Sequence, residues 1–61
     1  MTELERIQHI SALTLFYQQL HLTVVYENDF MKRLGSQKKM LLYRDEILDR
    51  INNRRRILGY I

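Results

Sequence analysis

A chain of 61 residues has room for one small domain, and the absence of cysteine excludes disulfides and thiolate metal sites as a means of stabilising it. Chains of this length bury only about 60% of the surface that they expose when unfolded, so self-association is the stabilising device that remains. The hydrophobic content of 46%, with no proline and two glycines, favours uninterrupted helix over a turn-rich β fold.

The formal net charge of +3 is unevenly distributed along the chain. Residues 1–31 contain one Arg against four acidic residues, whereas residues 32–61 contain nine Lys and Arg against three acidic residues. A basic half indicates either a nucleic-acid or acidic-protein partner, or a solvated helix face that complements the other half. No stretch approaches the roughly 18 apolar residues of a membrane span, and the N-terminus lacks a signal-peptide pattern. We therefore expect a cytoplasmic protein with no membrane contact.

The first predicted helix covers about residues 3–34. Thr2 followed by Glu5 fits a capping box at its start, and no residue forbids helix as far as Leu34. The run over residues 22–26 is nevertheless rich in residues that favour strands. An alternative therefore breaks this helix near His21 and leaves residues 22–26 extended, which gives three helices or a short strand that pairs between chains.

The second predicted helix covers about residues 37–58. Gly35 has the position of a glycine that ends a helix, and Ser36 that of an N-cap residue. The resulting fold class is all-α: a two-helix antiparallel hairpin with its turn at residues 35–36, forming a single helical-hairpin domain over residues 1–61.

A register test supports the hairpin. If the chain reverses between residues 35 and 36, residues whose numbers sum to 71 lie level on the two helices. The register predicts an ion pair between Glu27 and Arg44, and it places Arg54 beside Tyr17. It also brings apolar residues of the two helices opposite one another, in the pairs Met31–Met40, Val24–Ile47, Leu20–Ile51, Leu13–Leu58 and Ile10–Ile61.

A second apolar stripe lies on roughly the opposite side of the first helix. It consists of Leu4, Leu15, Leu22 and Tyr26, with Phe16 and Phe30 at its margins. One partner helix cannot cover both sides of a cylinder, so this stripe predicts an interface. We expect two hairpins to dimerise through it into a four-helix bundle. The alternative is that these residues are scattered apolar side chains on a monomer surface.

The sequence contains no pattern that predicts catalysis, a metal site or a bound cofactor. Glu5 and His9 have the spacing of a metal-binding pair on a helix, but zinc sites need three or four ligands. The carboxylates of Asp45, Glu46 and Asp49 lie on a predicted solvated face, without a pocket to separate their environments. We therefore expect a non-enzymatic protein with no cofactor.

The second helix carries the residue types that contact nucleic-acid phosphates and base edges. The candidate contacts with a nucleic acid or an acidic partner are Lys38, Lys39, Arg50, Arg55 and Arg56. Successive arginines point in different directions on a helix, which weakens this interpretation. The sequence thus predicts a small regulatory or adaptor protein that acts by protein–protein binding as a homodimer. A nucleic-acid-binding dimer that uses the basic second helix is the alternative.

Overall fold

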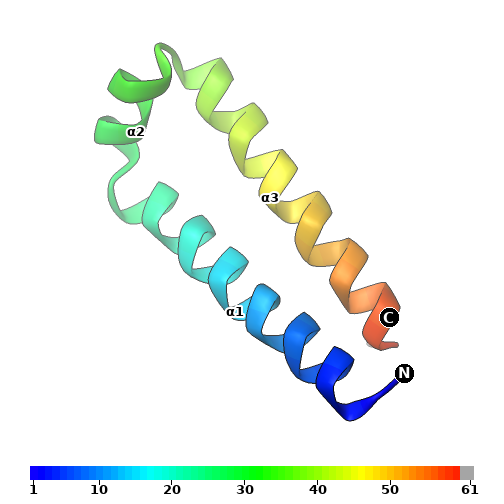
Figure 1. Cartoon of the computed structure of the whole chain (residues 1–61). Helices are drawn as coiled ribbons and strands as arrows, with labels where there is room; N and C mark the ends of the chain where they lie inside the picture. The colour runs from blue at the N-terminus through cyan, green and yellow to red at the C-terminus, as the bar shows by residue number, and fades with distance from the viewer. Residues whose placement is uncertain (60–61) are drawn as a thin grey trace.

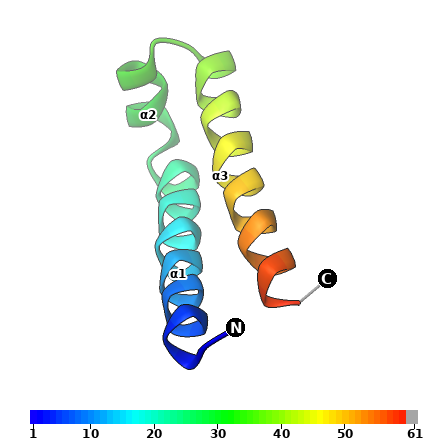
Figure 2. The same ribbon diagram turned by 45° about the vertical axis from the view of Figure 1, so that its right-hand side comes forward.

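The computed structural model describes residues 1–59 and has three α-helices there: α1 (Glu3–Val25), α2 (Glu27–Leu34) and α3 (Gln37–Leu58). α1 and α2 follow one another along one arm, and α3 runs back beside them (Figures 1 and 2). The molecule is elongated, with extents of 41 × 15 × 14 Å. No strand occurs among the described residues, so the all-α prediction is confirmed.

Local capping groups set the outer bounds of the helices. The Thr2 hydroxyl accepts a hydrogen bond from the Glu5 N–H at 3.2 Å, and the Ser36 hydroxyl accepts one from the Lys39 N–H at 3.2 Å. Gly35 ends α2 with φ at 101°, and its N–H donates to the Met31 carbonyl at 2.8 Å. Glycine adopts this left-handed conformation without strain. These bounds agree with the predicted start at residue 3, the turn at 35–36 and the end near residue 58.

The prediction of one continuous helix over residues 3–34 is wrong at Tyr26, which separates α1 from α2 with φ at −109° and ψ at 40°. Arg44 of α3 reaches this break and donates from Nη2 to the Thr23 carbonyl at 2.6 Å. An unbroken helix would offer that carbonyl to the Glu27 N–H. The alternative with a break near His21 gives the three helices that are present, but it places the break too early, because α1 stays helical through Val25.

The core is small and lies between α1 and α3. It consists of Leu13, Ile47 and Ile51, with exposed fractions of 1–6%, and of Met40, which is fully buried on α3. Partly buried side chains pack against the first three: Phe16, Leu20, Tyr43 and Leu58. The predicted pairs Leu20–Ile51 and Leu13–Leu58 thus fall within one cluster.

The predicted register holds near the turn. The Glu27–Arg44 pair is present, with Arg44 Nη2 4.0 Å from Glu27 Oε2. On the α1 side of the break at Tyr26 the register holds only in part. The pairs Leu20–Ile51 and Leu13–Leu58 lie in the core cluster. Val24, however, is 58% exposed and does not belong to the cluster that contains Ile47. The neighbouring Thr23 is buried in its place, since its hydroxyl accepts from Arg44 Nε at 3.1 Å.

Nearer the termini the departure from the register is larger. Arg54 Nη1 lies 2.6 Å from His9 Nδ1, and His9 precedes the predicted partner Tyr17 by eight residues. Tyr17 itself is 46% exposed. A register derived from one straight helix applies to α1 only in part, because the chain changes course at Tyr26. The predicted Ile10–Ile61 pair lies outside the described residues.

Candidate helix-pairing surface

α1 has a second apolar face that points away from α3. The exposed fractions of its five apolar side chains are 65% for Leu4, 51% for Ile7, 59% for Leu15, 43% for Leu22 and 55% for Val25. Ser11, Thr14 and Gln18 lie between them and are also exposed. We call these eight residues the outer α1 face. At 100° per residue they fall within an arc of about 100° on the helix surface.

α3 cannot cover the outer α1 face. The residues of α1 that turn toward α3 include Leu13, Phe16 and Thr23, which are buried or half-buried. On the helical wheel these positions are centred about 180° from the outer α1 face. Both sides of α1 are therefore apolar, and α3 packs against one of them.

The outer α1 face carries none of the formal charges that are usual on a solvated helix. No Asp, Glu, Lys or Arg occurs from Ile7 to Tyr26. One of its three polar groups, the Thr14 hydroxyl, is engaged within the helix, where it donates to the Ile10 carbonyl at 3.1 Å. Depletion of charged residues is the compositional mark of an interface core. An uncharged, half-apolar face of this length is thus typical of a helix that pairs with another.

The structure separates the predicted interface residues into two groups. Leu4, Leu15 and Leu22 lie on the outer α1 face and are available to a partner. Phe16 instead packs against the core between α1 and α3. Phe30 stacks on Tyr43 of α3, with ring centroids 6.0 Å apart and an interplanar angle of 24°. These two phenylalanines therefore serve the packing of the chain itself.

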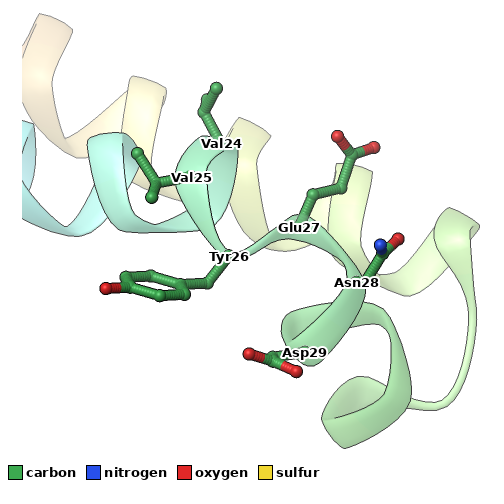
Figure 3. A pocket seen from close by; sticks show the side chains of 6 residues that line it. All are labelled: Val24, Val25, Tyr26, Glu27, Asn28 and Asp29. Carbon is green, nitrogen blue, oxygen red and sulfur yellow. The ribbon is translucent and has the colours of Figure 1, made fainter.

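Tyr26, the remaining predicted interface residue, lies at the break and is 52% exposed. It lines an open hollow of about 420 Å³ formed by the consecutive residues 24–29. In Figure 3 the side chains of Tyr26 and Asp29 lie on one side of the backbone that joins α1 to α2, and that of Glu27 lies on the other. Because Val25 belongs to both, the hollow adjoins the end of the outer α1 face.

Several exposed apolar residues were not predicted as part of any surface. Ile7 and Val25 complete the outer α1 face, and the helical spacing that identified Leu4 and Leu22 would have found them too. On α3 the exposed apolar side chains are Leu41, Leu42, Leu48 and Ile57, with exposed fractions of 41–54%. Of these, Leu41 and Leu48 are seven residues apart and share one side of the helix.

The structure does not gather the predicted basic contacts on one face of α3. Helical spacing places Lys38 and Arg56 on the same side as two carboxylates, those of Asp45 and Asp49. Lys39 and Arg50 share another side with Glu46. Arg55 lies on a third side and is half-buried. The basic charge of α3 is therefore divided among sides and interrupted by acidic residues.

Arg50 nevertheless belongs to a small hollow between α1 and α3. This hollow measures about 320 Å³ and is lined by Phe16, Arg50, Asn53 and Arg54. A guanidinium has donors but no acceptor, so in the Arg54–His9 contact His9 Nδ1 is the acceptor. His9 is thereby engaged with α3.

Among residues 1–59 no group of three or more acidic or histidine side chains is placed to hold a metal ion.

No helix in the described part of the chain combines the length and the apolar character that crossing a membrane requires. No protein-family model matches the chain, and neither a curated protein nor a solved structure shows significant similarity to it. The surfaces described above are therefore the basis for any functional assignment.

Proposed function

We propose that this chain is a small non-enzymatic regulatory or adaptor protein that acts by protein–protein binding, as a homodimer formed through the outer α1 face. The observation that carries the proposal is the exposure of five large apolar side chains on a helix face without any formal charge. Burial of apolar surface is the main favourable term in association. A second copy of the chain supplies a face of the same chemistry, which an interface between identical subunits requires.

The exposed area agrees with the needs of a dimer. The chain exposes 4781 Å², whereas a compact monomer of 7.5 kDa is expected to expose about 4,250 Å². The excess is about 500 Å² for each copy, or about 1,000 Å² for two, which reaches the lower limit of specific interfaces. Pairing through the outer α1 face would remove an area of this order from water.

The adaptor role would fall to α3. In a dimer that uses the outer α1 face, α3 of each copy stays on the outside. Leu41 and Leu48 then remain exposed on a helix that also carries both signs of charge. An apolar pair within a charged rim is the usual anatomy of a surface for a protein partner.

The dimer is tested by a pair of matched variants in sedimentation velocity at micromolar concentration. Leu15→Ser combined with Leu22→Ser removes two apolar side chains from the outer α1 face. Leu42→Ser combined with Ile57→Ser removes a similar area from exposed positions of α3. We expect the first pair to raise the dissociation constant at least about a hundredfold, because each Leu contributes roughly 1 kcal/mol or more and occurs twice per dimer. The second pair should leave the dimer unchanged.

A monomeric unmodified chain would contradict the proposal. Equal loss of dimer in both double variants would also contradict it, because the interface would then not be specific to α1. Circular dichroism at 222 nm on each variant separates loss of pairing from loss of helix.

A nucleic-acid-binding dimer remains the second candidate, and the observation in its favour is the hollow lined by Phe16, Arg50, Asn53 and Arg54. Guanidinium and amide groups are the side chains that contact nucleic-acid phosphates and base edges. This candidate predicts binding of labelled single-stranded RNA that weakens steeply as salt rises. This function would rank first if Arg50→Glu abolished RNA binding while the double variant Leu15→Ser, Leu22→Ser retained it.

A further inference from the structure

We infer that the two copies pair in antiparallel fashion, with α1 against α1 around a two-fold axis that passes between Thr14 and Leu15. The inference rests on the proposed homodimer and adds the direction and the register of the pairing. It follows from the order of residues along the outer α1 face.

The outer α1 face is nearly symmetric about its centre. When a second α1 runs in the opposite direction, residues whose numbers sum to 29 lie level. Leu4 then meets Val25, and Ile7 meets Leu22. Near the axis Thr14 meets Leu15. Apolar side chains thus contact apolar ones at both ends of the interface.

The polar residues of the face also match in this register. Ser11 lies level with Gln18 of the second copy, and both are exposed in the single chain. The Ser11 hydroxyl can exchange hydrogen bonds with the side-chain amide of Gln18, since each group has both a donor and an acceptor. Two such pairs, one on each side of the axis, would satisfy the polar groups that pairing removes from water.

A parallel arrangement packs less evenly. It would place Ser11 opposite Ser11, which leaves a gap, and Gln18 opposite Gln18, which crowds two long side chains. Protein interiors combine large with small side chains at facing positions to reach uniform density. The antiparallel register does this at the Ser11–Gln18 level.

The separation of the two Glu3 side chains and the helix dipoles favour the same direction. Glu3 lies beside Leu4 at the start of the face, and in a parallel pair it would lie close to the Glu3 of the second copy. Antiparallel pairing puts the two Glu3 side chains at opposite ends of a helix about 34 Å long. It also places the positive end of each helix dipole near the negative end of the other.

The inferred dimer has a definite shape. The outer α1 face and the face that contacts α3 lie on opposite sides of α1. Two copies would therefore form a layer in which both α1 helices are central and both α3 helices are outermost. This layer differs from the four-helix bundle expected from the sequence, in which each helix touches two neighbours.

Disulfide cross-linking tests the direction, because the chain has no cysteine of its own. A disulfide requires Cα atoms within about 7 Å, so cross-linking reports which residues are adjacent. The variants are Thr14→Cys, at the axis, and Leu4→Cys and Val25→Cys, at the two ends. Each is oxidised at micromolar concentration, and the products are resolved on a non-reducing gel. A mixture of the Leu4→Cys and Val25→Cys chains is oxidised in the same way, and its products are identified by mass.

We expect Thr14→Cys alone to cross-link efficiently, and Leu4→Cys and Val25→Cys each to cross-link at least about tenfold more slowly. In their mixture, a disulfide should link one chain with Leu4→Cys to one chain with Val25→Cys. Efficient cross-linking of Leu4→Cys and Val25→Cys with themselves would overturn the inference in favour of a parallel pair, while the proposed dimer would stand. A dimeric mass with no cross-linking in any variant would overturn both the register and the assignment of the interface to α1. Circular dichroism on each cysteine variant confirms that it retains its helix content.

Discussion

Arg44 is the residue whose contacts shape the chain most. Its guanidinium donates to the carbonyl and the hydroxyl of Thr23 at the end of α1, and it lies 4.0 Å from the Glu27 carboxylate at the start of α2. A cation at the C-terminus of one helix, beside an acid at the N-terminus of the next, complements both helix dipoles. Arg44, on the opposite arm of the molecule, therefore contacts both helix ends at the break at Tyr26.

The coupling between Arg44 and Thr23 is measurable with a double-mutant cycle. Thr23→Val keeps the shape of the side chain but removes the hydroxyl, which leaves Arg44 Nε without that acceptor. We expect the single change to lower the free energy of unfolding by about 1–2 kcal/mol in urea denaturation followed by circular dichroism. Combined with Arg44→Met, the loss should be smaller than the sum of the two single losses by about 1 kcal/mol. Additive losses would show that the two side chains act independently.

Burial separates two isoleucines of α3 that sequence alone does not distinguish. Ile47 is 1% exposed in the core and Ile57 is 51% exposed. Ile47→Val should lower the free energy of unfolding by about 1 kcal/mol, because it leaves a small cavity in a core of few residues. Ile57→Val, the same change at an exposed site, should alter it by less than about 0.5 kcal/mol. Equal effects measured at one protein concentration would contradict the described core.

The helices themselves were largely predictable, because their bounds depend on local capping groups. Thr2, Ser36 and Gly35 have the residue types that begin and end helices, and each occupies the predicted place. The break at Tyr26 was not predicted at its position, and the contact that accompanies it comes from Arg44, which lies 21 residues from Thr23 in sequence. The failure of the Val24–Ile47 and Tyr17–Arg54 pairs was unpredictable for the same reason. Local patterns carry no information on a contact between distant side chains.

The turn between α2 and α3 depends on the left-handed conformation of Gly35. A Cβ added there would meet only Lys39 side-chain atoms, at ordinary contact distances of 3.7 and 3.9 Å, so the cost of Gly35→Ala comes from the backbone. We expect it to lower the free energy of unfolding by about 1–2 kcal/mol. Gly59 is also left-handed, but it follows the last helix, where the end can fray; Gly59→Ala should cost less in the same urea experiment. A larger loss for Gly59→Ala would contradict this account of the turn.

At the scale of the whole molecule, the core is thin, and this supports the proposal that the chain pairs with a partner. The described fold is 41 Å long but only about one helix pair thick, and its core cluster has three buried side chains. The outer stripe on α1 was predicted in outline from helical spacing, through Leu4, Leu15 and Leu22. Helical spacing also includes Ile7 and Val25 in it, but only the orientation of α1 relative to α3 shows that this face is exposed. The inward direction of Phe16 and Phe30 also depended on tertiary packing that the sequence does not display.

Dimerisation predicts a thermal stability that depends on concentration. Association stabilises the folded state by mass action, so the midpoint of thermal unfolding should rise by several degrees when the protein concentration increases a hundredfold. Leu15→Ser combined with Leu22→Ser should remove this dependence, whereas Leu42→Ser combined with Ile57→Ser should retain it. Thermal scans by circular dichroism over that range measure the effect. A midpoint that is independent of concentration in the unmodified chain would contradict it.

The most direct test of the central claim is sedimentation equilibrium of the unmodified chain at micromolar concentrations. Pairing through the outer α1 face predicts a reversible equilibrium between one and two copies, with the mass approaching twice 7.5 kDa as the concentration rises. A mass that stays at 7.5 kDa throughout, in a chain that circular dichroism shows to be helical, would contradict the claim that α1 is covered by a second copy.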